Sequence, residues 1–402
     1  MPQCYTQNFF MPPTKEDLRD GFLMSAGLCP VANRDNERGE VLRGMTPLEL
    51  CREGLSWYAR KVPENEPDTI RTALSGGTVV ADAFTGALGQ AIAVGAAEAP
   101  DTTRGWCYET PVLNFKETTT LTINGSSSFK PLKRGGTAEH VDISIDGTSW
   151  KIARYAQQLF LEDQDLYDDT LRSLLLVARQ MGAAASRLRP DLVYSLLLAN
   201  AAIHDNVALF HADHGNLTTG GGSALSDNAL EVGLAAVGSQ TQTDPDGVAV
   251  HLGNQARFLV VPPSLVGTAR RVTRNVALGD GNDLEVRSES RISATGVIDP
   301  ATGTKQTGSA TNWILAAPAL AFPSVVVGYL DGQTSPTVRQ FGTRDAQTYK
   351  LDYDSPPEYR GLVPAGIKSG IGPGQWGVGW DIIMDIGAAA VDYKSLYKAA
   401  GA

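Results

Sequence analysis

Residues 160–217 constrain the fold most, because they combine an acidic turn, a long helical repeat and a compact polar turn. The apolar positions of the repeat are Leu171, Leu174, Leu175, Ala178, Met181, Ala185, Leu188, Leu192 and Ser195/Leu196. This spacing predicts a helix over about 163–200 with one buried face. Acidic residues before it lie where a helix dipole favours negative charge. Pro190 falls inside the repeat and predicts a kink, or two abutting helices.

Two strand-like segments precede this helix. Residues 114–123 are rich in threonine, and residues 141–145 alternate apolar and polar side chains. A two-stranded ribbon is marginal in water by itself, so we expect this one to lie on another subunit. The candidate contact residues at its tip are Lys133, Arg134, Gly135, Gly136 and Thr137.

The N-terminal 76 residues suggest an irregular arm with little core of its own, which neighbouring molecules would order. A short helix is expected at Lys15–Ser25. Thr46-Pro47-Leu48-Glu49 has the pattern of a capping box, with proline at the first helical position, and predicts a helix to about Arg60. Residues 78–99 predict a further helix of small residues.

Helices and strands also mingle after residue 217. Helices are expected at 226–237, capped by Ser226 or Asp227, and at 265–278. The expected strands are 258–261, 313–317, 324–330 and 347–353. Residues 279–311 suggest a long surface loop, and 380–398 a terminal strand or helix. This mixture predicts an α+β fold.

The bulk properties argue against several classes of protein. A net charge of −10 disfavours a surface that grips DNA throughout. Four cysteines without a CxxC pair suggest a reducing compartment. No run of 18 apolar residues or signal-peptide pattern is evident, so we expect no membrane span. Neither GxSxG nor a phosphate-binding GxxxxGK[ST] motif is present, and we expect no enzyme activity and no cofactor.

A histidine-rich turn follows the long helix. His204, His211, Asp213 and His214, with Asp205, place three imidazoles and two carboxylates within eleven residues and could bind zinc. The spacing lacks the HExxH pattern of helical zinc sites. The interpretation we favour is that these side chains hydrogen-bond a tight turn. The alternative is a metal-dependent hydrolase that uses this cluster.

The phrases RLRPDLVYSLLLANAA and, shortly afterwards, ALFHADHGNL resemble the major head subunit of tailed bacteriophages. The similarity is greatest to the Mu-type head protein and to subunits made fused to a prohead protease. It spans roughly Val79 to the C-terminus and is densest between Leu132 and Val261. It implies the Hong Kong ninety-seven-type capsid fold.

The resemblance implies a division of the chain into named parts. These are an N-terminal arm (1–76), a helix leading to the peripheral domain (77–111), an extended hairpin called the E-loop (112–156), the spine helix of the peripheral domain (157–201), an axial domain with peripheral strands (202–345) and a C-terminal return to the peripheral and axial sheet (346–402). The E-loop would reach across a neighbouring subunit. Arg172, Arg179 and Arg187 form a basic line on the spine helix, which would meet phosphate or carboxylates at the lumen or a subunit boundary; a solvated face is the alternative.

The function implied is a structural major capsid protein that assembles as hexamers and pentamers into an icosahedral head around double-stranded DNA. Expected partners are copies of itself, a portal, a scaffold or prohead protease during assembly, a decoration protein, and DNA through weak non-specific contacts. We expect assembly in the host cytoplasm and a final location in the virion. The alternative from another class is an encapsulin-like compartment shell, which shares the fold.

Overall fold

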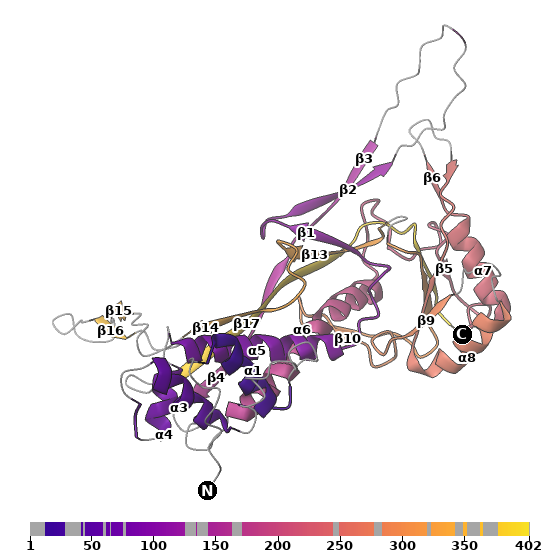
Figure 1. Cartoon of the computed structure of the whole chain (residues 1–402). Helices are drawn as coiled ribbons and strands as arrows, with labels where there is room; N and C mark the ends of the chain where they lie inside the picture. The colour runs from indigo at the N-terminus through magenta and orange to yellow at the C-terminus, as the bar shows by residue number, and fades with distance from the viewer. Residues whose placement is uncertain are drawn as a thin grey trace. The chain divides into compact units, whose positions relative to one another are not determined.

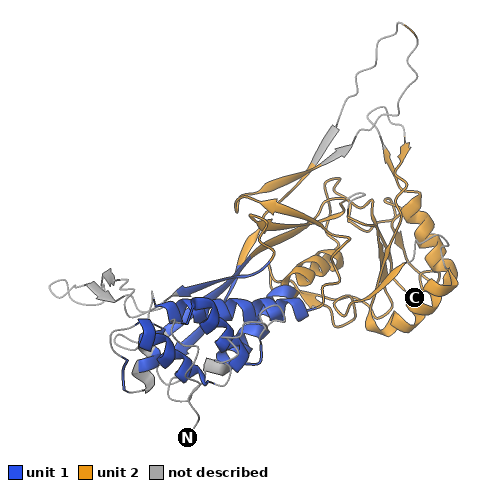
Figure 2. Cartoon of the chain, viewed as in Figure 1, with its two compact units in different colours: residues 1–99, 155–186, 335–384 blue, residues 100–154, 187–334, 385–402 orange. Residues whose placement is uncertain are grey.

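The computed structural model describes residues 13–28, 42, 45–58, 62–64, 66–74, 78–124, 134, 144–162, 171–243, 249–276, 284–319, 323–341, 349–351, 362–364 and 377–401. Figure 1 shows the elements along the chain. The chain forms two compact units (Figure 2). Unit 1 comprises residues 1–99, 155–186 and 335–384, and unit 2 comprises residues 100–154, 187–334 and 385–402. Each unit takes several separate pieces of the sequence.

Among the described residues, unit 1 contains four N-terminal helices. They are α1 (Lys15–Ser25), α3 (Pro47–Tyr58), α4 (Glu66–Ala73) and α5 (Val79–Glu98). The predicted capping box is confirmed: the Thr46 backbone N–H donates to Glu49 at 2.7 Å, and the Glu49 N–H donates to the Thr46 hydroxyl at 3.3 Å. Thr14 and Asp17 form the same reciprocal pair at the start of α1. Both helices therefore begin where side chains satisfy free backbone donors.

The core of unit 1 contradicts the expectation that the N-terminal arm has little core. Phe22 of α1 packs edge-on against Phe84 of α5, with ring centroids 5.2 Å apart. Phe84 also contacts Trp380, whose indole N–H donates to Thr85 at 3.1 Å. Leu50, Leu55 and other arm residues are buried in the same cluster. The prediction underestimated these helices because each is short, and their apolar faces meet only in the fold.

Helix α6 (Leu171–Ala199) is a single helix that continues through Pro190, so the prediction of two abutting helices is wrong. Its first half packs against α5 in unit 1. A Cβ atom at Gly182 would overlap the carbonyl oxygen of Ile92, and one at Gly95 would overlap the carbonyl oxygen of Arg179. The two backbones therefore approach so closely that only glycine fits at these two positions.

Helix α5 is also long and apolar enough to cross a membrane, judged by length and composition alone. Its buried residues include Phe84, Leu88 and Ile92, which belong to the core cluster of unit 1. In this structure, then, the apolar face of α5 is a packing face of the core.

The strands of unit 1 are β4 (Ala153–Glu162), β14 (Thr337–Phe341), the first part of β17 (Gly377–Ala390), and the paired β15 (Tyr349–Leu351) and β16 (Leu362–Pro364). β14 runs antiparallel to β17, with Thr337 opposite Ile383 and Phe341 opposite Gly379. β4 also pairs with β17. The terminal strand or helix expected at 380–398 is instead parts of two strands, β17 and β18 (Leu396–Ala399).

Unit 2 contains a sheet with the strand order β5-β18-β12-β8-β9. The strands are β5 (Leu217–Thr218), β18 (Leu396–Ala399), β12 (Trp313–Ala316), β8 (Phe258–Val261) and β9 (Glu285–Ser288). Helices α7 (Asp227–Gly238) and α8 (Val266–Asn275) share its core, which includes the fully buried Trp313. The short helix η3 (Pro263–Leu265) leads into α8. Ser226 caps α7, as predicted.

Unit 2 contains a second group of strands, which includes a two-stranded ribbon. β1 (Tyr108–Val112) runs parallel to β13 (Val325–Leu330), and β13 runs antiparallel to the end of β17. The ribbon consists of β2 (Thr118–Asn124) and β3 (Ser144–Trp150). Two small hairpins complete the described strands: β6 (Thr241–Thr243) with β7 (Ala249–His251), and β10 (Val297–Ile298) with β11 (Lys305–Gln306).

The predicted surface loop at 279–311 is wrong in part. β9 joins the main sheet of unit 2, and Ile292 is fully buried. Glu289 is also buried, and its carboxylate accepts hydrogen bonds from Thr102 and Arg291. Gly, Ser and Thr gave this segment the composition of a loop, although the fold supplies distant partners for its polar groups. The α+β class itself is confirmed by the mixture of helices and sheets.

Candidate functional site

The β2–β3 ribbon is joined to unit 2 at its base. Its register runs from Thr118 opposite Trp150 to Asn124 opposite Ser144. Within the described residues, these two strands pair with each other and with no further strand. Trp150 is buried in a cluster with Val112 and Val391, and its indole N–H donates to Thr120 at 2.8 Å. Trp150 therefore anchors one end of the ribbon, whereas Thr119, Leu121, Gly147 and Ser149 are exposed.

Apolar side chains are exposed on and beside this ribbon. Leu113 is 82% exposed, Leu121 is 57% exposed and Phe115 is 43% exposed. The Arg154 guanidinium lies 5.3 Å from the centre of the Phe115 ring and is held by Asp385 at 2.8 and 2.9 Å. Exposed large apolar groups gathered on one segment indicate a surface that binds another protein.

The predicted contact residues at the tip are almost all outside the described part of the chain. This holds for Lys133, Gly135, Gly136 and Thr137, whereas Arg134 is described and exposed. Their role stays a prediction.

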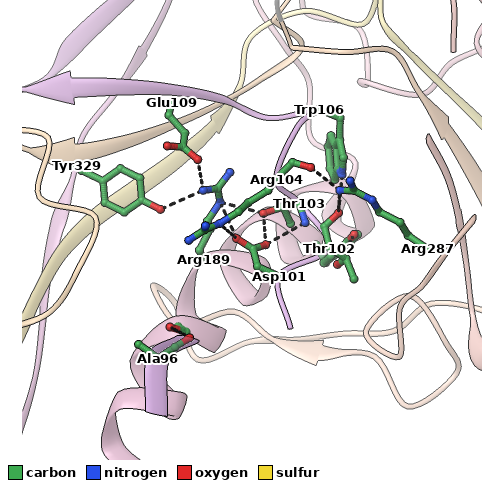
Figure 3. Close-up of polar contacts among 12 residues, drawn as sticks. Ala96, Asp101, Thr102, Thr103, Arg104, Trp106, Glu109, Arg189, Arg287 and Tyr329 are labelled. Carbon is green, nitrogen blue, oxygen red and sulfur yellow. Dashed lines mark hydrogen bonds and ion pairs between the residues drawn. The ribbon is translucent and has the colours of Figure 1, made fainter. Parts of the chain in front are cut away.

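A buried arginine organises the polar interior of unit 2 (Figure 3). The Arg189 guanidinium donates to the Thr103 hydroxyl at 2.9 Å, to Glu109, and to the Tyr329 hydroxyl at 3.5 Å. Its Nε lies 3.5 Å from the Asp101 carboxylate. Asp101 in turn accepts from the backbone and hydroxyl of Thr103 at 2.9 and 2.6 Å. The cluster ties α6 to the 101–109 segment.

Burial by itself would lower the pKa of Arg189, yet Tyr329, Asp101 and Glu109 together raise it, so the guanidinium stays charged. Burial also raises the pKa of the neighbouring Cys107 thiol, which keeps it protonated and unreactive. One guanidinium nitrogen, Nη2, is buried without a protein partner in the described structure. This cluster fixes the Arg189 guanidinium against its carboxylate partners, and its protonated Cys107 thiol is not an activated nucleophile.

A second arginine, Arg291, extends the same interior. It bonds Asp191 of α6 and donates to Glu289 at 3.0 Å. Glu289 accepts from Thr102, whose hydroxyl also lies 2.9 Å from the Tyr194 hydroxyl. Arg287 donates to the Thr102 carbonyl at 2.9 Å (Figure 3). The second half of α6 is thus fixed by charged hydrogen bonds to segments about 100 residues away on either side.

At Arg179, the basic line of the long helix meets a carboxylate of the same chain. Within unit 1, Arg179 donates to Glu98 of α5 at 2.9 and 2.6 Å. Arg187 is exposed, and the Arg172 side chain lies outside the described part. Whether Arg172 and Arg187 meet phosphate or another copy stays a prediction.

The histidine-rich turn uses its ring nitrogens for internal hydrogen bonds. His214 lies 2.8 Å from Asp205 and 3.2 Å from the Leu209 carbonyl, and its ring stacks on Tyr393 at 3.9 Å. His204 contacts the Val391 carbonyl at 3.0 Å, and His211 accepts from the Asp213 backbone at 3.2 Å. Among the described residues, no group of three or more His, Cys, Asp or Glu side chains could hold a metal ion.

The sequence did not predict the buried hydrogen-bond clusters around Arg189 and Arg291. Arg189 lies between Leu188 and Pro190 within the apolar repeat. That position was the available signal, because a charge on the buried face of a helix requires a partner. Asp101 and Glu109, at a distance of 80 residues or more along the chain, could not be identified as those partners from the sequence.

Comparisons with known proteins identify one family. A family model described as phage capsid protein matches residues 146–399. No curated protein matches the sequence. Among solved structures, the mature capsid of bacteriophage PhiM1 is 10% identical, with a TM-score of 0.45, covering 74% of this chain and 86% of that one. The capsid of the cyanophage P-SCSP1u is 13% identical, with a TM-score of 0.44 and coverage of 75% and 88%. The SrpI encapsulin of Synechococcus elongatus is 13% identical, with a TM-score of 0.39 and coverage of 73% and 84%.

Proposed function

The chain belongs to the family of phage capsid proteins, and from that premise we propose that it forms hexamers and pentamers of an icosahedral head around double-stranded DNA. Its role is that of a structural major capsid protein of the virion, which assembles with copies of itself. The narrower resemblance to Mu-type head subunits, and the absence of any enzymatic activity, are part of the proposal.

The observation that carries the proposal is the uncovered ribbon. A two-stranded ribbon is marginal in water, and this one exposes Leu121 in the strand, with Leu113 and Phe115 just before it. Burying one such side chain against a neighbour stabilises a contact by about 1.5–3 kcal/mol. We propose that β2 and β3 form the E-loop and lie on the adjacent subunit. Closure of a symmetric shell adds many such contacts together.

The test is to place a charge on the ribbon. Leu121→Asp should leave the subunit folded and abolish shells, because a carboxylate cannot be buried unpaired in the contact. Negative-stain microscopy and size-exclusion chromatography measure assembly, and circular dichroism measures folding. Leu121→Ile, which keeps an apolar strand former, is the matched control and should form normal shells. Normal shells from a folded Leu121→Asp protein would contradict the proposed contact.

Further partners follow from the same proposal. A portal, a scaffold or prohead protease, and a decoration protein would take part, with assembly in the host cytoplasm. The encapsulin-like compartment is the other class to be tested. Nuclease-protected DNA inside purified shells supports the viral head, and a packaged enzyme would support the compartment.

A further inference from the structure

Helix α8 presents a concentrated positive charge on a chain whose net charge is −10. Its ten residues, VGTARRVTRN, carry three arginines and no acidic residue. Arg270, Arg271 and Arg274 are all exposed. In the described structure, no hydrogen bond or ion pair joins any of these three side chains to another residue.

The folded core does not need these three charges. Helix α8 contributes Ala269 and Val272 to the core of unit 2, on the face opposite the arginines. Asp227 of α7 reaches the end of α8, but its carboxylate accepts from Asn275 at 3.0 Å. Arg274 lies in the last turn, where the helix dipole favours a cation. Arg270 and Arg271 lie before that turn and lack this explanation.

Two other arginines of unit 2 are used differently. Arg189 is buried among Asp101, Glu109 and Tyr329, and Arg291 is paired with Asp191 and Glu289. These residues show that the fold supplies partners where a guanidinium has an internal role. The arginines of α8 are therefore placed to meet a partner outside the chain.

The chemistry of this face distinguishes it from the ribbon. The exposed positions of α8 are arginine, asparagine and glycine, with half-exposed threonines, and its buried positions are apolar. Protein–protein contacts also use arginine, but they combine it with apolar and aromatic anchors at their centre. Leu121 of the ribbon and Phe115 just before it offer such anchors, whereas the exposed positions of α8 do not. Contacts to nucleic-acid backbones instead use Arg and polar side chains that reach phosphate oxygens.

We infer that the Arg270, Arg271 and Arg274 face of α8 binds the phosphate backbone of duplex DNA without sequence preference. This rests on the proposed function, which places duplex DNA inside the shell. A ten-residue helix is about 15 Å long. Over that length each DNA strand carries about four phosphates. Arg270 and Arg274 lie only about 6 Å apart along the helix axis, a length over which each DNA strand carries about two phosphates. Many copies in a shell would multiply this weak individual contact.

The test measures binding of a labelled 25-base-pair duplex of mixed sequence to unassembled subunits, by fluorescence anisotropy at a series of low salt concentrations. The variant is Arg270→Gln/Arg271→Gln/Arg274→Gln, since glutamine keeps a similar helix propensity. Each lost phosphate contact should make the log–log salt dependence shallower by about 0.9, so by about 2 to 3 in all. The affinity should fall at least about tenfold at the lowest salt.

A charge-matched control removes three dispersed, exposed cations of unit 2: Lys116→Gln/Arg257→Gln/Lys305→Gln. It should bind as the natural protein does. Arg→Lys at the three α8 positions keeps the charge and should keep the salt dependence. Thermal melting establishes that each variant is folded.

Equal loss in the α8 and control variants would overturn the inference, since binding would then follow net charge. Unchanged binding in the α8 variant would also overturn it. Failure of the folded α8 variant to form shells, with DNA binding intact, would show that this face meets another copy instead. A natural chain that forms no shells under any condition counts against the proposed function, whatever the DNA measurement gives.

Discussion

At the scale of single residues, the interior of unit 2 depends on buried charged groups that pair with one another. Arg189 is 3% exposed and faces Asp101, Glu109 and Tyr329. Removing one member of a buried pair leaves the others uncompensated, which costs far more than losing a surface pair. The same carboxylate, Asp101, also bonds the exposed Arg104 at 3.2 Å. These two arginines therefore make a direct comparison of buried and exposed pairing.

We expect Arg189→Met to lower the free energy of unfolding by about 3–5 kcal/mol, because Asp101 keeps its charge without its buried partner. Arg104→Gln should lower it by less than about 1 kcal/mol. Urea unfolding of the unassembled subunit, followed by tryptophan fluorescence, measures both. Equal midpoints for the two variants would refute a stabilising role for the buried pair.

The histidine-rich turn predicts a specific dependence on acid. Burial alone would raise the pKa of Asp205, but hydrogen bonds from the Val207 backbone and from His214, with the nearby imidazoles, lower it. A lowered folded pKa means that ionised Asp205 stabilises the fold above its unfolded pKa of about 3.9. This stabilisation is lost as pH falls below about 4 and through the folded pKa.

Asp205→Asn should therefore reduce stability at neutral pH and flatten its decline between about pH 5 and pH 2. Urea midpoints measured across that range provide the test, with Asp213→Asn as the control because that carboxylate is 76% exposed. Parallel pH profiles for the natural protein and Asp205→Asn would contradict the assignment.

At the scale of elements, sequence patterns predicted local structure well and packing partners poorly. The capping box at Thr46, the helix at Lys15–Ser25 and the strand at 258–261 follow from short-range rules, and the structure confirms them. The core of the N-terminal helices and strand β9 depend on contacts across long stretches of sequence. Periodicity shows which face of an element is apolar, but not what will cover it.

The crossing of α5 and α6 offers the clearest prediction at this scale. Gly182→Ala should destabilise unit 1 by about 1–3 kcal/mol, because the new methyl group meets the Ile92 backbone carbonyl, which cannot move alone. Gly89→Ala is the matched control: it lies in α5, and a Cβ there meets no atom within 4 Å. That change should stabilise the protein by up to about 1 kcal/mol through helix propensity. Thermal unfolding distinguishes the two signs, and equal shifts would refute the close crossing.

At the scale of the whole molecule, the family assignment rests on residues 146–399. The resemblance seen in the ALFHADHGNL phrase is confirmed at the level of the phage capsid family. The arrangement of the turn itself required the structure, because His204 and His214 find their partners near Val391 and Tyr393 at the far end of the sequence.

We expect shell formation to be insensitive to metal chelators. His214 has both ring nitrogens in contact with protein oxygens, and metal binding would break those hydrogen bonds. Shells treated with EDTA should keep their melting temperature and their appearance by microscopy. A lower melting temperature that zinc restores would contradict this and revive the metal-site interpretation.

The placement of β18 has a consequence for biosynthesis. In unit 2, Leu396–Ala399 lies between β5 and β12, strands that the ribosome makes about 180 and 80 residues earlier. Until those four residues emerge, β12 keeps one open edge and β5 has no strand to join, and open edges invite pairing with other chains. The sheet of unit 2 therefore closes only after residue 399 has been made. A nascent chain that ends before Leu396 would therefore keep the edge of β12 open to pairing with other chains.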